Sequence, residues 1–485
     1  MANNVKTNLI FQLFYRVLTV ITPLITTPIL SRSLGSEKLG VYSASLAFVN
    51  YFMLFAMLGI ENYGNRSIAA VQGDKKLMQR LFWNVYAIQL IASVLSILGY
   101  GISLLLVDNE RFLITLFQGL WLISNLINVN WFFFGTEQFR ITVIRNTIIK
   151  ILTVVLIVLL IKSPNDLYIY AIIMAGDAIL SNLIMLPFLR KNLGFEKPSF
   201  PLMREHIKPI MILFIPILAM SIFHIMDKTM LDVLSTEQNS GFYYAADKLI
   251  NIPMAAIAAL GTVMLPRIAN MMGNSKNKNN VSLVLGKSTE LMFFLASAVG
   301  MGIAAIAKEF VPFFFGDGYE PCVKLIYWFV PVLFVKAISE LIRTQYLVPA
   351  HEDKKYTLAI ISGAVVNLFA NYFLIRAFGA LGAVLGTLIA ETVVSIAQII
   401  LTYREIKFLN FILQNIWYVV LSLVMLAVVR IAAFTFNIPD IYKIIVMIVV
   451  GGLTYMLLCI IVWKINKKSI FHNLKIKDLV KQLVK

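Results

Sequence analysis

The feature of this sequence that most limits its fold is a recurrence of apolar runs long enough to cross a lipid bilayer. A transmembrane helix needs about 20 mainly apolar residues. Hydropathy places such runs at 8–31, 38–60, 82–107, 112–135, 142–162, 166–190, 207–234, 241–265, 284–307, 322–347, 356–376, 379–403, 412–434 and 438–463. Only 14% of the residues are charged, whereas a soluble domain has about 25%. The sequence therefore predicts an all-α polytopic membrane protein with about 14 transmembrane helices.

The basic residues indicate which way these spans run. Lys and Arg total 42 against 25 Asp and Glu, which gives a net charge of +17. In a soluble chain this balance would suggest nucleic-acid binding, but the cytoplasmic loops of membrane proteins also carry an excess of Lys and Arg. The basic residues are concentrated on the side of the membrane that holds the N-terminus, most heavily at 190–208 and 464–485. We therefore expect both termini to face the cytoplasm, and we expect no nucleic-acid partner.

Weak internal repetition divides the chain into two halves. Sliding the sequence along itself pairs Gly40 with Gly241 and Tyr42 with Tyr243. The predicted divisions are an N-terminal lobe at 1–200, a C-terminal lobe at 201–406, two additional transmembrane helices at 407–465 and a basic cytoplasmic tail at 466–485. With about six spans each, the lobes would be parallel repeats, and transporters built in this way hold their substrate between the repeats.

Catalytic and metal-binding motifs are missing from the sequence. It contains no phosphate-binding P-loop, no GxSxG and no HExxH pattern. Its 4 histidines and 2 cysteines do not group at metal-ligand spacing. The sequence therefore predicts a transporter and not an enzyme, with no cofactor and no metal site. Its energy would come from an ion gradient, the membrane potential or the substrate gradient.

Ionisable side chains inside the predicted spans are the first candidates for function, because charge at membrane depth is costly and usually faces a cavity. Arg16 lies in the first span and Arg32 ends it, while Lys228 lies in the seventh. Two of them also have a structural interpretation. Arg16 could extend its side chain to the cytoplasmic surface, and Lys228 could pair with Asp232 one helical turn later.

Lys248, in the eighth span, completes a set of four cations. The planar guanidinium group of arginine can bind two phosphate oxygens at once, whereas lysine supplies a single point charge. A cavity that collects Arg16, Arg32, Lys228 and Lys248 predicts an anionic, phosphate-bearing substrate. Tyr243 offers an aromatic face on which a sugar could stack.

Asp227 is the candidate for ion coupling, since it lies within a span and has His224 as its nearest local partner. The aromatic run 131–134 is also available to a sugar. Because this run lies at the end of a span, an interfacial aromatic belt is the stronger interpretation.

Four other polar residues have structural interpretations. Glu61 and Asn62 close the second span, where a simple helix cap is expected. Asp177 and Glu391 occupy repeat-related places in the sixth and twelfth spans, which predicts packing or lobe-stabilising bonds more than transport.

Several short stretches carry a resemblance to a known family. They are 27–35, 40–42, 62–66, 226–231, 241–248 and 265–267. In these stretches the sequence resembles the Wzx-type oligosaccharide flippases of the multidrug/oligosaccharidyl-lipid/polysaccharide exporter superfamily, and the resemblance extends over essentially the whole chain. It implies alternating-access translocation of undecaprenyl-diphosphate-linked oligosaccharide repeat units across the bacterial cytoplasmic membrane, for capsule, exopolysaccharide or teichoic-acid-type polymers. It also implies the polysaccharide polymerase and glycosyltransferases of the same pathway as candidate partners.

The resemblance extends to individual residues. The lipid II flippases are related and have a similar Tyr-Ala-Asp-Arg turn, which implies a cavity cation at Lys248 and a second at Arg32. Lysine in place of arginine loses the bidentate geometry. Drug and sodium exporters of the superfamily use an acidic residue in the first span, where this chain has Arg16 and no acid. A lipid II flippase, an ion-coupled multidrug exporter and a non-transporting membrane scaffold remain as alternatives.

Overall fold

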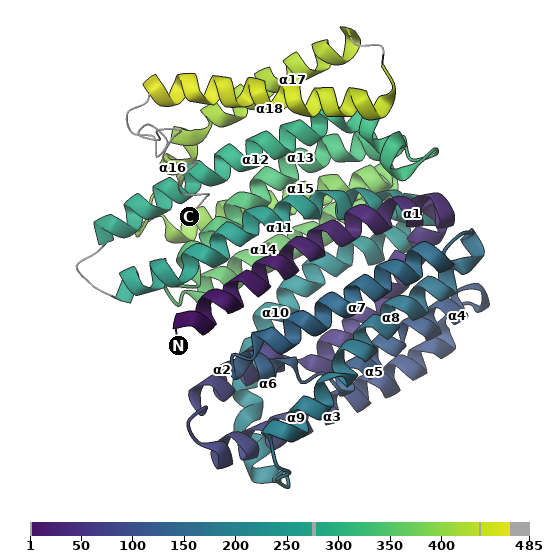
Figure 1. The fold of residues 1–485 in the computed structure, drawn as a ribbon, viewed down its shortest axis with the longest axis vertical. Coiled ribbons are helices and arrows are strands. Elements are labelled where there is room, and N and C mark those ends of the chain that lie inside the picture. Colours follow the sequence, from purple (N-terminus) through teal and green to yellow (C-terminus); the bar gives the residue numbers. More distant parts are fainter. Residues whose placement is uncertain (1, 274–277, 436–437, 466–485) are drawn as a thin grey trace. The chain divides into compact units, whose positions relative to one another are not determined.

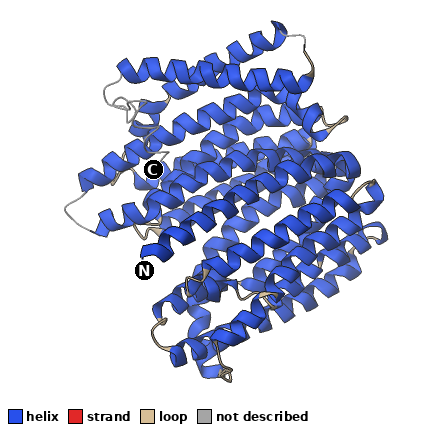
Figure 2. Ribbon diagram, viewed as in Figure 1, coloured by secondary structure: helices blue, strands red, loops and turns tan. Residues whose placement is uncertain are grey.

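The computed structural model describes residues 2–273, 278–435 and 438–465, and these residues form helices and no strands (Figure 2). Within them, 12 helical stretches are long and apolar enough to cross a membrane. The prediction of an all-α polytopic membrane protein is confirmed, whereas the count of about 14 spans stays a prediction. One reason for the difference is that the second predicted span and the last part of the first lie in the single stretch Ile21–Ala70.

Contacts along the backbone group the chain into two compact units, unit 1 at Met1–Ala245 and unit 2 at Ala246–Lys485. The division into lobes at 1–200 and 201–406 stays a prediction.

The helices of unit 1 are shown from purple to teal in Figure 1. They are α1 (Ala2–Met57), α2 (Ile60–Ala70), α3 (Lys75–Ser103), α4 (Asn109–Gln118), α5 (Leu120–Leu126), α6 (Asn130–Gly135), α7 (Phe139–Leu160), α8 (Leu167–Leu183), α9 (Met185–Asn192) and α10 (Phe200–Leu234), with short 3-10 helices at Leu104–Leu106 and Pro164–Asp166. The next helix, α11 (Glu237–Gly273), begins in unit 1 and continues into unit 2. Helix α1 is the main packing partner in unit 1, because it contacts α3, α7 and α10.

Local sequence signals set where these helices begin and bend. Asp74 precedes α3, and its Oδ1 accepts hydrogen bonds from the backbone N–H groups of Lys76 and Leu77 at 3.0 Å each. This is the capping that an aspartate at a helix start provides. Gly35 interrupts α1 with φ 76° and ψ 170°, a conformation that is essentially restricted to glycine. The break lies between the first two predicted spans.

The aromatic run of α6 lies inside unit 1. Trp131, Phe132 and Phe133 are at most 1% exposed, while Phe134 is 39% exposed. The Trp131 Nε1–H donates to Gln89 Oε1 of α3 at 2.9 Å. The interpretation of this run as an interfacial belt is therefore wrong, because the short helix α6 packs against α2 and turns three of its four rings into the core.

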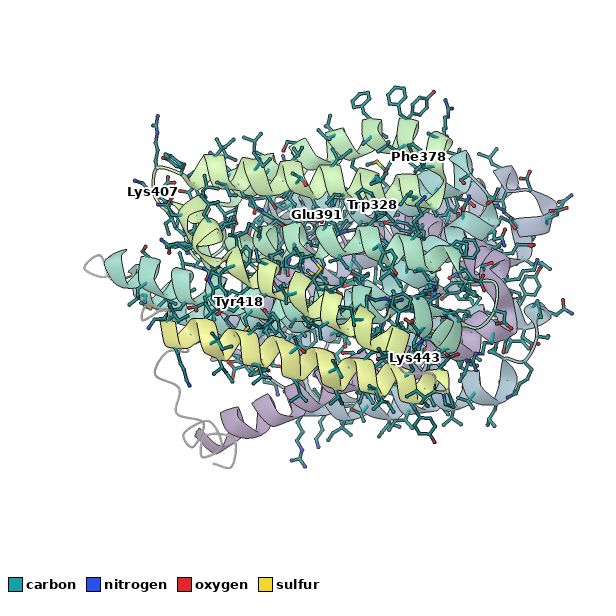
Figure 3. All side chains as sticks on the ribbon, turned by 90° about the horizontal axis from the view of Figure 1, so that it is seen from above. Trp328, Phe378, Glu391, Lys407, Tyr418 and Lys443 are labelled. Atoms are coloured by element: carbon teal, nitrogen blue, oxygen red, sulfur yellow. The ribbon has the colours of Figure 1, made fainter. Side chains whose placement is uncertain are left out.

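The described residues of unit 2 form the rest of α11 and seven further helices. These are α12 (Lys278–Phe315), α13 (Pro321–Ile342), α14 (Asp353–Phe378), α15 (Ala380–Thr402), α16 (Phe408–Asn415), α17 (Trp417–Thr435) and α18 (Asp440–Ile465), with a π-helical turn at Arg343–Leu347. Figure 3 places Lys407 at one end of the unit 2 helices and Lys443 at the other.

The last helices of unit 2 dock on α12. Helices α17 and α18 lie side by side and both contact α12 (Figure 1). Tyr418 of α17 donates to Glu290 Oε1 at 3.1 Å, and Trp463 Nε1 of α18 donates to the Tyr418 hydroxyl at 2.8 Å. Arg430 of α17 forms an ion pair with Glu309 at 2.7 Å. The tail predicted at 466–485 lies outside the described residues.

The two repeat-related carboxylates make contacts of the predicted kind. The Thr153 hydroxyl donates to Asp177 Oδ1 at 2.6 Å in unit 1. In unit 2, the Ser339 hydroxyl lies 3.5 Å from Glu391 Oε2. Each carboxylate thus meets a hydroxyl from a neighbouring helix, which fits a role in helix packing.

Candidate functional site

Two glycines that the sequence register pairs bring helices α1 and α11 into backbone contact. A Cβ atom added to Gly40 would overlap the carbonyl oxygen of Glu237, and one added to Gly241 would overlap the carbonyl oxygen of Ser36. The same register pairs Ser36 with Glu237, so the contact is reciprocal. Small residues allow helices in membranes to approach this closely. The repetition in the sequence therefore corresponds to a contact in unit 1.

Three of the predicted site residues lie beside this crossing. Asp227 of α10 is only 4% exposed, and the Tyr243 hydroxyl donates to its Oδ2 at 3.0 Å. The Lys228 Nζ lies 6.0 Å from the centre of the Tyr244 ring, within the range of a cation–π contact. The Tyr244 ring in turn packs on Tyr42 of α1, with 6.2 Å between ring centres.

The remaining predicted residues belong to α1 and α11. Arg32 is exposed on α1. Arg16 lies in the same helix, but its side chain lies outside the described part of the chain. Lys248 is half-buried in α11 and belongs to unit 2. The assignment of Arg16, Arg32, Lys228, Lys248 and Tyr243 to the substrate, and of Asp227 to ion coupling, stays a prediction.

An arginine that the sequence analysis did not select joins three helices. Arg111 of α4 donates from Nη1 to both carboxylate oxygens of Asp232, at 2.8 and 2.9 Å. Its Nε and Nη2 donate to Glu237 Oε1 at 3.1 and 2.6 Å. The helical spacing suggested that Asp232 pairs with Lys228, but in the structure Arg111 binds Asp232. The partners are 121 positions apart, so no helical spacing could have revealed them.

We expect Arg111→Ala to lower the thermal midpoint of unfolding of the purified protein. The substitution removes four charge-assisted hydrogen bonds. Leaving a partly buried carboxylate without its partner lowers the free energy of unfolding by about 1–3 kcal/mol. Arg111→Lys keeps the charge but loses the fork, so its midpoint should fall between those of Arg111→Ala and the wild type. Arg190→Ala, at an exposed position of α9, is the matched control. A midpoint for Arg111→Ala equal to that of the control would contradict the expectation.

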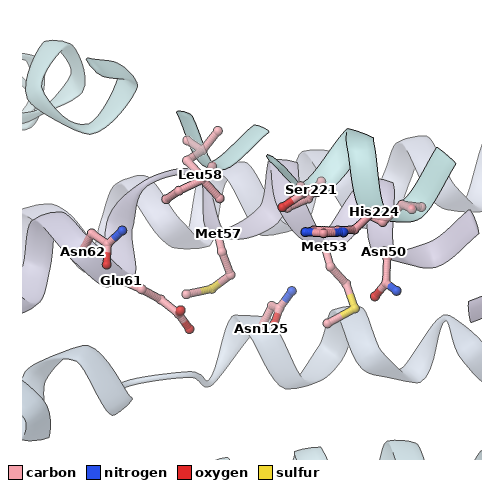
Figure 4. A pocket seen from close by; sticks show the side chains of 12 residues that line it. Asn50, Met53, Met57, Leu58, Glu61, Asn62, Asn125, Ser221 and His224 are labelled. Carbon is pink, nitrogen blue, oxygen red and sulfur yellow. The ribbon is translucent and has the colours of Figure 1, made fainter. Parts of the chain in front are cut away.

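A cavity of about 410 Å³ lies between α1, α2, α5 and α10 of unit 1 (Figure 4). We call it the amide cavity. Its lining residues are Asn50, Met53, Leu54, Met57, Leu58, Glu61, Asn62, Asn125, Ile217, Ser221, His224 and Ile225. Figure 4 shows the Met57 side chain between those of Glu61 and Asn125, with Ser221 and His224 across from Asn125. The lining combines apolar faces with amide, carboxyl, hydroxyl and imidazole groups.

Asn125 marks the amide cavity as a site for a polar ligand. The residue is 5% exposed, and its Nδ2 has no hydrogen-bond partner among the described residues. A buried donor without a partner costs about 1–3 kcal/mol, so native structures rarely leave one unused. Glu61, close by, accepts a hydrogen bond from Asn128 Nδ2 at 3.3 Å.

The amide cavity was not predicted from the sequence. Glu61 and Asn62 were interpreted as a helix cap, and Asn50, Asn125 and Ser221 were not selected. A signal was present, since asparagines inside apolar runs are unusual. However, these asparagines follow no fixed spacing in the sequence, so the sequence does not show which of them lie close together in the fold.

Comparisons with known proteins agree with this architecture. The model of a family described as polysaccharide biosynthesis protein matches residues 5–272. A protein of Escherichia coli (strain K12), named a candidate O-antigen transporter, is 20% identical over 396 residues, which cover 81% of this chain and 95% of that protein. The lipid II flippase MurJ of Bacillus subtilis (strain 168) is 24% identical over 143 residues, which cover 29% of this chain and 26% of MurJ. Among solved structures, lipid II flippase MurJ in an inward closed conformation superposes with a TM-score of 0.76 at 15% identity, covering 94% of this chain and 99% of that one. At this identity the structural likeness concerns the fold alone.

Proposed function

Since the chain belongs to the polysaccharide biosynthesis protein family, we propose that it moves an undecaprenyl-diphosphate-linked oligosaccharide across the bacterial cytoplasmic membrane. The chain is a multi-pass membrane protein and a flippase for a lipid-linked substrate, and it is not an enzyme. The proposal adds the direction, from the inner to the outer leaflet, and the product, a capsule, exopolysaccharide or teichoic-acid-type polymer. It also places both termini in the cytoplasm.

The observation that carries the proposal is the polar interior of unit 1. Ionisable groups inside a membrane bundle are costly and usually mark a pathway for a substrate or an ion. The amide cavity and the buried Asp227 supply them between helices that are otherwise apolar. A substrate with a polar headgroup and a lipid tail requires this combination.

Within the proposal, the cations Arg16, Arg32, Lys228 and Lys248 bind the diphosphate, because phosphate oxygens need positive partners. Asp227 takes part in ion coupling, which its burial and its bond from Tyr243 support. The two lobes, 1–200 and 201–406, alternate in access to the two sides of the membrane. The pathway's polymerase and glycosyltransferases are the proposed protein partners.

Replacement of Lys248 tests the diphosphate assignment. We expect Lys248→Ala to abolish export of surface polymer while the protein remains in the membrane, because the variant lacks the positive point charge that binds the phosphate. Lys248→Arg, which keeps the charge, should retain export. Lys407→Ala, at an exposed position of unit 2, is the control. Polymer quantified on the cell surface gives the readout, and full export by Lys248→Ala would remove this residue from the site.

A second candidate function is the flipping of lipid II. The local sequence match to MurJ of Bacillus subtilis supports it. Expression of this chain in cells depleted of their own lipid II flippase separates the two candidates. Rescue of growth would favour lipid II, and failure to rescue together with export of a surface polymer would favour the oligosaccharide.

A further inference from the structure

We infer that the amide cavity receives a sugar residue of the lipid-linked oligosaccharide, to which Asn125 donates a hydrogen bond and from which Glu61 accepts hydrogen bonds. The inference rests on the proposed function and deepens it by separating the sugar site from the diphosphate site. It makes Glu61, Asn125 and Ser221 specificity-determining residues.

The size of the amide cavity suits one part of the substrate. Its volume of about 410 Å³ lies within the range of about 300–1,000 Å³ that small-molecule sites have. A whole lipid-linked oligosaccharide, with its long polyprenyl chain, does not fit in such a space. The cavity therefore accommodates either the charged linkage or a sugar.

The charge of the lining disfavours the diphosphate. Glu61 is the acidic residue of the lining, and neither lysine nor arginine is among its residues. A diphosphate would meet the carboxylate of Glu61 and would have the imidazole of His224 as its one basic partner, whereas phosphate sites in proteins are built from cations and backbone N–H groups. The proposed cations Arg32 and Lys228 also lie outside the lining. The remaining part of the substrate is the sugar.

The polar groups of the amide cavity match sugar hydroxyls. A hydroxyl both donates and accepts hydrogen bonds, and so does an asparagine side chain, while a carboxylate accepts several. Three asparagines line the cavity, Asn50, Asn62 and Asn125. The buried Nδ2 of Asn125 still needs an acceptor, which a hydroxyl oxygen supplies. Met53 and Met57 offer apolar surface to the C–H face of a sugar ring.

A chain of hydrogen bonds that starts at the buried Gln89 fixes the positions of Asn125 and Glu61. Gln89 of α3 is fully buried, and its Nε2 donates to the carbonyl oxygens of Asn125 at 2.7 Å and Asn128 at 2.9 Å. Asn128 in turn donates to Glu61 at 3.3 Å. Trp131 fixes the other end of Gln89 through its Nε1–H. A site that reads hydroxyl positions needs its groups fixed in this way before the ligand arrives.

The test measures binding by the full-length protein in lipid nanodiscs with two probes. One probe is the lipid-linked oligosaccharide extracted from cells that lack the gene, and the other is undecaprenyl diphosphate without sugar. The variants are Asn125→Ala, Glu61→Gln and Ser221→Ala. Asn410→Ala, at an exposed asparagine of α16, is the matched control. Thermal unfolding identifies the variants that fold, and Ser221→Ala is the mildest change of the three.

We expect each cavity variant to weaken binding of the oligosaccharide probe about tenfold, as the loss of one hydrogen bond predicts, and to leave binding of undecaprenyl diphosphate unchanged. Equal weakening for both probes, or no weakening by any folded variant, would overturn the inference and leave the proposed function standing. A wild-type protein that binds both probes equally would also overturn it. A wild-type protein that binds neither probe would instead count against the proposed function.

Discussion

Replacing Gly241 with alanine is expected to abolish export of the surface polymer and to lower the yield of folded protein. The added Cβ would overlap the carbonyl oxygen of Ser36. That oxygen belongs to the backbone, so no change of side-chain rotamer can relieve the contact. Overpacking of this kind costs about 1–3 kcal/mol or more. The repeat-related change Gly40→Ala, which meets the carbonyl of Glu237, should have the same effect.

Gly452→Ala is the matched control for this pair, because a Cβ at that position of α18 meets no atom within 4 Å. Size-exclusion chromatography of the detergent-extracted protein reports folding, and polymer on the cell surface reports transport. Wild-type export and yield for Gly241→Ala would contradict the reciprocal contact between α1 and α11.

Replacing Asp227 with asparagine is expected to reduce export more than tenfold while the protein folds as the wild type does. Asparagine has nearly the same shape and can still accept the hydrogen bond that Tyr243 now donates at 3.0 Å. It removes the charge and turns one acceptor oxygen into an amino donor, and a charge buried inside a membrane bundle usually has a function. Tyr243→Phe, which removes the hydroxyl but keeps the ring, should have a smaller effect.

These two substitutions separate coupling from packing. If Asp227 serves only to hold α10 against α11, the asparagine variant should export normally. Tyr243→Phe should then lower the thermal midpoint of unfolding more than Asp227→Asn does. If Asp227 carries an ion, the asparagine variant should lose export at any pH at which the wild type works. Normal export by Asp227→Asn would end the coupling assignment.

The sequence predicted the helices well because lipid leaves little choice of backbone. A chain in a bilayer must satisfy its own N–H and C=O groups, so long apolar runs become helices. The pairing of Gly40 with Gly241 was also visible, because repeated units place equivalent residues at equivalent contacts. The break at Gly35 followed from the same runs, since it lies between two of them.

Contacts between distant segments were not predictable in the same way. Arg111 meets Asp232 across 121 positions, and a helical spacing suggested Lys228 as the partner of Asp232. Trp131 was assigned to the membrane surface from its place at the end of a run, but the packing of α6 on α2 buries it. The amide cavity needs residues from four helices, and asparagines carry no spacing rule that would bring them together.

The most direct test of the flippase function is deletion of the gene, followed by measurement of the lipid-linked oligosaccharide pool and the surface polymer. We predict that the undecaprenyl-linked unit accumulates on the cytoplasmic leaflet and that the surface polymer is lost. The mass of the accumulated unit would also identify its sugars. An unchanged pool with normal polymer, accompanied by altered sensitivity to cationic drugs, would contradict this function and indicate a multidrug exporter.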